Sequence, residues 1–334
     1  MKTFFSFLLC LSPFVTQAQR LVNTNNQFIG GNTFAKYTSL FWIVPEPTGG
    51  FSLIGQTNDS ASGDVPPHAG GRALMKIRFD SNGQRIATTV KNYRVSMSSV
   101  VRTADNNLLF MGMIDTANED LLLFKTDTNL NLLWEKSYGS TSQEWSVNAI
   151  EVENRNILAF GLSAGRNRDI PYNHTPPGPF PPTDFVLIKT DSLGNKLWVK
   201  VLGTSGDEEI QGKVLTDGTY YYLSVTTKAK DYEFTDSTTY PNVNGGSMYF
   251  GSFLVKLDTA GNIIYSRSLG HSWVYDAFYD NRDSTILVAG EIGGVTPPYA
   301  GNLYGLFDMS LVKAKPSDGS VIWANHYGFA GEAT

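Results

Sequence analysis

The feature that most constrains the fold of this chain is an internal repeat. The stretch DFVLIKTDSLGNKLWVKVLG (184–203) has close copies in DLLLFKTDTNLNLLWEKSYG (120–139) and GSFLVKLDTAGNIIYSRSLG (251–270). Each copy reads as an apolar strand, a turn that opens with Asp, and a second strand with an aromatic residue near its start. A chain that repeats one such unit stacks the copies, because a single unit cannot bury its own apolar faces.

The recurring positions predict a turn and a packing contact. We expect each aspartate to accept backbone N–H bonds in its turn, and Gly194 to adopt a positive φ angle. The aromatic ring after each turn is expected to fill the space between neighbouring units, and a glycine follows it five residues later. The predicted structural repeat residues are Asp80, Asp127, Asp191, Asp258, Gly194, Trp134, Trp198, Tyr265 and Trp323, and the recurring glycines are Gly139, Gly203, Gly270 and Gly328.

The repeat predicts an all-β fold, a β-propeller of four-stranded blades. Two further apolar strands separate successive copies of the hairpin, so one unit contains four short strands joined by turns. The predicted units are 72–119, 120–183, 184–249 and 250–305. The segments 306–334 and 28–57 each hold half a unit, so we expect a fifth, composite blade that closes the ring by pairing N- and C-terminal strands. The alternative is that the chain is a fragment of a longer propeller.

The N-terminus reads as a secretory signal peptide. MKTFFSFLLCLSPFVTQAQ has a basic residue, a short apolar run and small residues that end at Ala18, which predicts a signal over 1–18, cleavage before Gln19, and a repeat domain over 19–334. We therefore expect a secreted or cell-surface protein. The only cysteine, Cys10, lies in the signal, so the mature chain is expected to have neither disulfides nor thiolate metal ligands.

Charge and hydropathy narrow the class of partner. Asp and Glu number 31 against 26 Lys and Arg, and this mild acidic excess argues against nucleic acid, which requires a basic patch. No segment after the signal is apolar over enough residues to span a bilayer.

The repeat also resembles a known group of proteins. GGFSLIGQTND, HAGG, LMKIRFDSNGQ and LVKLDTAGNIIYSRSLG resemble the β-propeller repeat proteins that Gram-negative bacteria export by the type IX route. The phrase DGSVIW (318–323) is similar to the turn-plus-Trp of quinoprotein-type propellers, in which the Trp docks blades. The resemblance implies architecture and export, and it implies no cofactor.

Candidate site residues lie in the long irregular segments between units. The segments 58–71, 164–183, 228–249 and 293–305 share one topological position, so we expect them at one end of the blades, where loops on a rigid scaffold bind ligands. DVPPH and DIPYNH recur in two of them and predict a ligand or metal site formed by Asp64, His68, Asp169 and His174. The alternative is a proline-stiffened loop in which the aspartate caps a turn.

Three other motifs carry weaker signals. GLSAG (161–165) matches the nucleophile pattern around Ser163, but no helical period follows it, as an α/β-hydrolase would require. DTNLN (127–131) and SGDEE (205–209) space oxygens as calcium loops do but lack the rest of that motif. No catalytic residue, metal ligand set or cofactor is assigned from these motifs.

The sequence predicts a secreted binding or scaffold module whose partner is an extracellular glycan or protein. One alternative is an extracellular propeller hydrolase or lyase acting on glycans, which would need carboxylates converging on the central channel. A second alternative is a structural segment of a larger cell-surface adhesin.

Overall fold

The computed structural model describes residues 38–59, 65–69, 71–93, 95–114, 119–174, 182–229, 231–235, 251–270, 273–293, 298–299, 301, 303–304 and 307–328. The predicted signal peptide (1–18), with Cys10 and the cleavage point before Gln19, lies outside these residues. Within them, no helix has the length and apolar character needed to cross a membrane.

The described strands form five antiparallel sheets of four consecutive strands each. This is the blade composition of a five-bladed β-propeller, so the predicted fold class and blade number are confirmed. The only described helix with assigned bounds is one 3₁₀ turn, η2 (Glu153–Arg155). The blades are β1 (Thr38–Pro45), β2 (Phe51–Thr57), β3 (Ala73–Phe79) and β4 (Arg85–Asn92); β5 (Val95–Arg102), β6 (Leu108–Ile114), β7 (Leu121–Thr126) and β8 (Leu132–Tyr138); β9 (Glu144–Glu151), β10 (Ile157–Ser163), β11 (Asp184–Thr190) and β12 (Lys196–Leu202); β13 (Glu208–Thr216), β14 (Tyr221–Thr227), β15 (Gly251–Leu257) and β16 (Ile263–Gly270); and β17 (Trp273–Asp280), β18 (Thr285–Ile292), β19 (Asp308–Ala314) and β20 (Val321–Tyr327).

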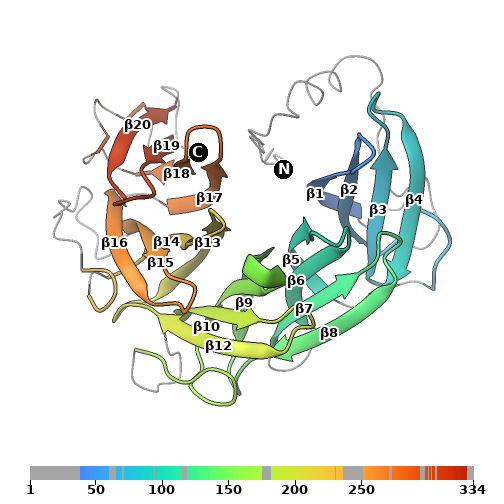
Figure 1. Ribbon diagram of the computed structural model, residues 1–334, viewed down its shortest axis with the longest axis horizontal. Coiled ribbons are helices and arrows are strands. Elements are labelled where there is room, and N and C mark those ends of the chain that lie inside the picture. Colours follow the sequence, from blue (N-terminus) through green and yellow to red (C-terminus); the bar gives the residue numbers. More distant parts are fainter. Residues whose placement is uncertain are drawn as a thin grey trace. The chain divides into compact units, whose positions relative to one another are not determined.

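The described chain divides into two compact units, which are β1–β4 and the four blades β5–β20. In the four-blade unit the first strands, β5, β9, β13 and β17, lie toward the inside, and the fourth strands lie toward the outside (Figure 1). The third strands β7 and β11 are buried along their whole length, whereas the fourth strand β8 is mostly exposed. A continuous apolar run is what a strand covered on both faces requires.

The core of the four-blade unit lies between its blades. One apolar cluster includes Leu123 and Ile188 from neighbouring blades, a second includes Phe160 and Phe253, and a third includes Leu254 and Val288. In the first unit a smaller cluster gathers around Ile77. Within the four-blade unit, neighbouring blades therefore bury one another's apolar faces, which is the physical reason for the repeat.

The structure divides the repeat into blades at a different place from the predicted one. Strands β1 and β2 pair with β3, and β19 and β20 pair with β18, so the predicted composite blade of 306–334 with 28–57 is wrong. The repeated hairpin (184–203) supplies the third and fourth strands of its blade. The predicted blade borders at the long loops are also wrong, because those loops join the second and third strands of a single blade. Short links such as 139–143 and 203–207 connect successive blades, since five extended residues span about 17 Å.

The repeat aspartates form the outer turns. Asp191 Oδ1 accepts the backbone N–H groups of Leu193 at 2.9 Å and Asn195 at 2.8 Å, and Gly194 has φ 79°. Asp80 and Asp258 accept two backbone N–H groups in the same way.

The repeat aromatics lie between neighbouring blades. Trp198 Nε1 donates to Thr259 O at 3.3 Å in the next blade, and a Cβ on Gly261 would lie 3.1 Å from the Trp198 ring. Only glycine leaves room for this contact. The same arrangement joins Trp134 to Gly194 and Tyr265 to Gly319, and Trp323 stands opposite Lys313 on the last hairpin, as Trp198 stands opposite Lys189.

Candidate functional site

Two of the loop candidates fall in the segment between β2 and β3, in the first unit. Asp64 lies outside the described residues. His68 Nδ1 forms a hydrogen bond with Asn92 Oδ1 at 3.0 Å, and its Nε2 contacts the Asp59 carbonyl. These contacts tie the loop to its own blade.

The other two candidates, Asp169 and His174, lie in one loop of the four-blade unit but contact different groups. Asp169 accepts the Gly139 N–H at 3.2 Å and pairs with Lys196. His174 pairs with two other carboxylates, described below. In the part of the chain that the structure describes, no group of three or more His, Cys, Asp or Glu side chains is placed to hold a metal ion.

Three blades of the four-blade unit share a cross-strand pair of aspartate and glycine at the loop end. The aspartate stands at or next to the start of the third strand, opposite the glycine that follows the fourth. A Cβ on that glycine would overlap the carboxylate, which explains why glycine recurs in the sequence at this position. The pairs are Asp120 with Gly139, Asp184 with Gly203 and Asp308 with Gly328, for which the Cβ to Oδ1 distances would be 2.4, 2.2 and 2.0 Å.

Two of these glycines are also held by the long loop that comes next in the chain. Gly139 donates its N–H to Asp169 Oδ2 at 3.2 Å, and Gly203 donates to Glu233 Oε2 at 3.1 Å. We call this arrangement the clasp. It joins the end of one blade to a loop of the next.

The two clasp loops have the same local geometry. Arg168 and Tyr232, which precede the clasp acids, have left-handed φ angles of 57° and 48°. Ile170 and Phe234, which follow the acids, are buried. The signal in the sequence is the pair NRDI (167–170) and DYEF (231–234), a short repeat inside loops that the sequence analysis treated as irregular.

Beneath each clasp lies a buried glutamate at the start of an inner strand. Glu208 accepts hydrogen bonds from Thr204 N at 2.6 Å and Thr204 Oγ1 at 2.7 Å. Glu144 accepts from Ser140 Oγ at 2.5 Å and Ser163 Oγ at 2.7 Å. The second oxygen of each, Oε2, has no hydrogen-bond partner among the described residues.

Burial raises the pKa of both glutamates. The pKa of Glu208 rises to about 9, since the side chain is almost completely removed from water and Asp184 and Asp207 add negative charge nearby. The pKa of Glu144 is raised for the same reason, with Asp120 as the neighbouring charge. Glu208 is therefore protonated at neutral pH.

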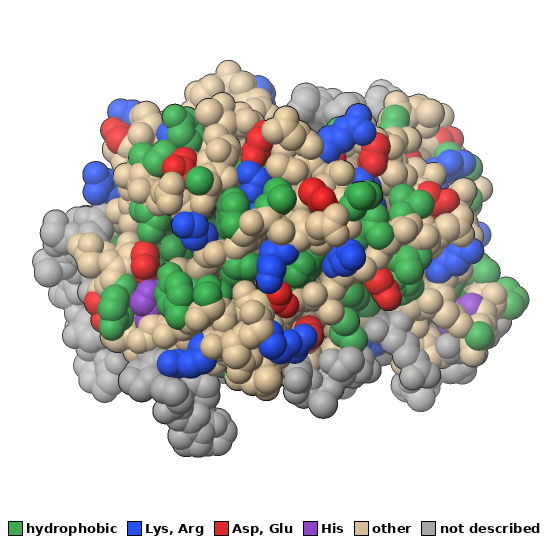
Figure 2. Space-filling model, turned by 60° about the horizontal axis from the view of Figure 1, so that its bottom comes forward, with side chains coloured by type: hydrophobic (Ala, Val, Ile, Leu, Met, Phe, Trp, Pro, Cys, Tyr) green, Lys and Arg blue, Asp and Glu red, His purple; other side chains and the backbone are tan. Residues whose placement is uncertain are grey.

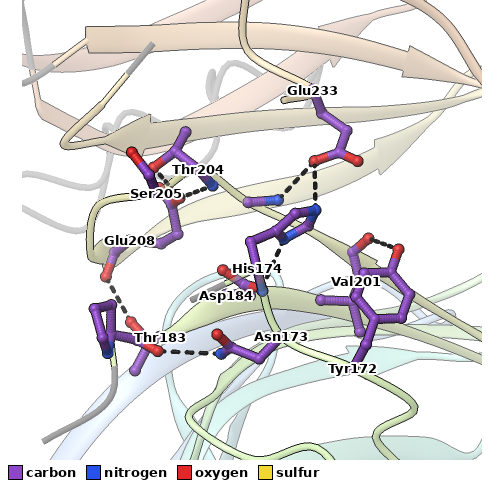
Figure 3. A network of polar contacts seen from close by, with 12 residues as sticks. Tyr172, Asn173, His174, Thr183, Asp184, Val201, Thr204, Ser205, Glu208 and Glu233 are labelled. Carbon is purple, nitrogen blue, oxygen red and sulfur yellow. Dashed lines mark hydrogen bonds and ion pairs between the residues drawn. The ribbon is translucent and has the colours of Figure 1, made fainter. Parts of the chain in front are cut away.

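His174 lies between two carboxylates (Figure 3). Its Nδ1 lies 2.8 Å from Asp184 Oδ2, and its Nε2 lies 3.2 Å from Glu233 Oε2. Both ring nitrogens therefore face carboxylate oxygens, which hold the imidazole from two directions. Burial raises the pKa of Asp184, and hydrogen bonds from His174 partly offset this effect.

Two tyrosines flank the His174 ring and are exposed to solvent. The ring centroid of Tyr172 lies 5.4 Å from that of His174, and the centroid of Tyr232 lies 4.7 Å from it. Tyr172 is 46% exposed and Tyr232 is 56% exposed. We define Tyr172, His174, Asp184, Tyr232 and Glu233 as the tyrosine–histidine site. Of these five residues, only His174 is a candidate from the sequence alone.

The remaining sequence motifs have structural roles. Ser163, the serine of GLSAG, is buried at the end of β10 and donates its hydroxyl to Glu144. In SGDEE, Asp207 accepts the N–H of Thr183 at 2.9 Å, and Glu209 pairs with Lys228 at 3.0 Å. These contacts use the carboxylates within the protein.

The tyrosine–histidine site is suited to binding. Its base is a buried ion-paired network, and its outer surface consists of two aromatic rings and one partly exposed carboxylate. Figure 2 shows one face of the molecule, on which acidic, basic and hydrophobic side chains are interspersed. On such a mixed surface a binding site is distinguished by the side chains at the site itself and not by the overall charge of the face.

Comparison with known proteins shows similarity at the level of fold only. No family model and no curated protein matches the chain. A protein of unknown function from Bacteroides caccae has a similar structure, with 10% identity, a TM-score of 0.45, and coverage of 85% of this chain and 80% of its own. The Synechocystis apocarotenoid oxygenase has 12% identity and a TM-score of 0.48, and the alignment covers 86% of this chain but only 61% of that enzyme. At these identities the similarity says nothing about activity.

Proposed function

We propose that this protein is a secreted or cell-surface β-propeller binding module whose ligand contacts the tyrosine–histidine site. The observation that carries the proposal is the pair of half-exposed tyrosines whose rings lie close to His174. A large aromatic side chain on the surface leaves apolar area in water, and this cost is recovered when a ligand covers the ring.

The rigidity of the site supports binding. Tyr172 donates its hydroxyl to Val201 O at 2.9 Å, which anchors the ring to β12. His174 is held by carboxylates on two of its sides. Groups that are fixed before the ligand arrives lose little conformational entropy on binding.

The buried acids favour a binding module over a hydrolase. Glu144 and Glu208 have the raised pKa values that a general acid needs, but they are buried and accept hydrogen bonds from Ser and Thr hydroxyls of their own turns. A catalytic acid has to reach the bond that it protonates.

The proposal is tested with the mature chain from Gln19 onward on an array of neutral, acidic and amine-bearing glycans and extracellular proteins. We expect at least one class to bind, and binding to be lost in the Tyr172→Ala/Tyr232→Ala double variant. Leu193→Ala is the matched control, since Leu193 is 61% exposed in the turn at the opposite end of the same blade. Ligand binding that the double variant retains at full strength would contradict the assigned site.

A further inference from the structure

We infer that the ligand of the tyrosine–histidine site is a neutral sugar chain, whose pyranose rings stack against Tyr172 and Tyr232. This inference rests on the proposed function, because it names the chemical class of ligand for the same site. Three properties of the site carry it: the aromatic surfaces, the carboxylate beside them, and the charge of the base.

The aromatic surfaces match the apolar face of a pyranose. One side of such a ring presents C–H groups, which pack on an aromatic face and remove apolar area from water. Tyr172 and Tyr232 come from two different loops and flank the same imidazole at 5.4 and 4.7 Å between ring centroids. Because both rings lie close to one imidazole, a short oligosaccharide is long enough to contact both tyrosines.

The carboxylate of Glu233 supplies the polar part of recognition. It is held by the Gly203 N–H and by His174, yet its side chain keeps 23% of its exposure. A fixed, partly exposed carboxylate accepts hydrogen bonds from sugar hydroxyls, and charge-assisted hydrogen bonds are stronger than neutral ones. Stacking on tyrosine and bonding to carboxylate together match a molecule with C–H faces and hydroxyl edges.

The charge of the base favours a neutral ligand over an anionic one. Two carboxylates, Asp184 and Glu233, meet a single imidazole, so an anionic ligand would add like charge close to them. A neutral hydroxylated ligand leaves both contacts of His174 in place. The titration below separates a neutral ligand from a cationic one.

The equivalent clasp loop of the preceding blade supports a role for Tyr232 outside folding. There the same left-handed position carries Arg168, whose Nη2 lies 3.0 Å from Asp120 Oδ2. The clasp therefore forms with an arginine that covers its own aspartate. In the second clasp His174 contacts the aspartate, Asp184, and the ring of Tyr232 is exposed to solvent.

The test is isothermal titration of the mature chain with three soluble probes. The probes are neutral glucan, mannan and galactan oligosaccharides; a galacturonate oligosaccharide of similar length; and a trimethyl-lysine peptide. We expect a neutral oligosaccharide to bind and Tyr232→Ala to weaken it about tenfold, since stacking on one aromatic ring contributes about that factor. Tyr232→Phe keeps the ring and should change affinity less than about threefold. Leu193→Ala should leave affinity unchanged.

Each result separates the inference from the proposed function. Binding of the charged probes alone, lost in Tyr232→Ala, would overturn the neutral-sugar assignment and leave the binding site standing. Neutral-sugar binding that is the same in Tyr232→Ala and wild type would place the ligand elsewhere and overturn both. Absence of binding by all three probes would overturn the sugar assignment, and absence of binding on the full array as well would overturn the proposed function.

Discussion

The four-blade unit contains the clasp in two versions, and their difference is instructive. The first joins Asp120, Gly139, Glu144 and Asp169, and the second joins Asp184, Gly203, Glu208 and Glu233. Both have the aspartate against glycine, a buried glutamate with a raised pKa, and an acid that accepts the glycine N–H. The backbone geometry of the two loops is also shared.

The two versions differ in how the aspartate is neutralised. In the first, Arg168 pairs with Asp120 and its Nη1 donates to Ser140 O at 2.6 Å, so the guanidinium covers the junction. In the second, His174 from the preceding loop pairs with Asp184, and Tyr232 takes the place of Arg168. One frame is thus closed by an ion pair, while the other exposes an aromatic surface. A change at one loop position, together with a histidine on the aspartate, thus replaces a covering guanidinium with an exposed aromatic ring.

The largest effect is expected where both versions depend on glycine. In Gly203→Ala the new Cβ would lie 2.2 Å from Asp184 Oδ1 and 3.1 Å from His174 Nδ1, so the pair must shift. Steric strain and the disturbance of this buried contact together should lower the free energy of unfolding by about 4 kcal/mol. Urea unfolding measures this change.

Gly218→Ala is the control for Gly203→Ala. Gly218 has φ +90° with no atom within 4 Å of its would-be Cβ, so alanine there meets backbone strain alone, about 1 to 2 kcal/mol. Gly203 has no such backbone strain, so a loss in Gly203→Ala smaller than that in Gly218→Ala would show that the contact with Asp184 is unimportant.

Removal of His174 is expected to have the next largest effect. His174→Ala leaves the buried Asp184 without its side-chain partner, which should cost about 3 kcal/mol. In the background Asp184→Asn no charge is left unpaired, so the same substitution should cost about half as much. A double-mutant cycle measures the coupling free energy between His174 and Asp184. Additive losses would mean that the two side chains do not interact in solution.

The buried glutamate of the second clasp predicts a dependence on pH. The pKa of Glu208 is raised from its ordinary value of 4.5 to about 9 in the folded protein. The contribution of Glu208 to the free energy of unfolding is complete below pH 4.5, where the side chain is protonated in both the folded and the unfolded protein. Between pH 4.5 and 9 the unfolded chain releases the proton while the folded protein keeps it, so stability falls as pH rises.

Glu208→Gln should remove this loss. The amide cannot ionise, and its oxygen can accept the hydrogen bonds from Thr204 that Glu208 Oε1 accepts. We expect unfolding free energies within about 0.5 kcal/mol of wild type at pH 4.5, and a gain of about 1 to 3 kcal/mol at pH 8. Glu135→Gln, at an exposed position on β8, controls for the loss of a negative charge. A variant that follows the wild-type pH profile would show that Glu208 is ionised in the folded protein.

The sequence predicted those parts of the fold that depend on local patterns. Alternating apolar runs and the turn around Asp191 and Gly194 were sufficient for strands, hairpins and blade number. The borders of the blades could not be predicted in this way. In a run of consecutive antiparallel strands, each strand can pair with the one before it and the one after it, so the pattern does not show where one sheet ends. The blade borders are set by the short links that follow the fourth strands and lead to the next blade. The apolar pattern of the strands does not show which link joins two blades.

The candidate site was only partly predictable for a different reason. His174 stood out through its motif, but its partners Asp184 and Glu233 are brought to it by the pairing of β11 and by a loop of the next blade. Asp184 opened the repeated phrase and was counted as part of a strand. Tyr172 and Tyr232 gave no signal, because a tyrosine in an aromatic-rich chain reads equally well as core.

The smallest expected change in stability comes from exchanging the residue that distinguishes the two clasps, and it sharpens the comparison most. Tyr232→Arg places in the second clasp the side chain that Arg168 provides in the first. Because Tyr232 is 56% exposed and the left-handed position already accepts arginine once, unfolding should shift by less than about 0.5 kcal/mol. Ligand affinity should fall about tenfold, since the stacking surface is lost.

The reverse exchange, Arg168→Tyr, should lower the unfolding midpoint, because Asp120 loses its cation and no histidine replaces it. Arg168→Tyr should leave ligand affinity unchanged. Thermal unfolding and titration of the two variants side by side would measure both effects, and a Tyr232→Arg protein that binds as wild type does would show that the two clasps do not differ in function.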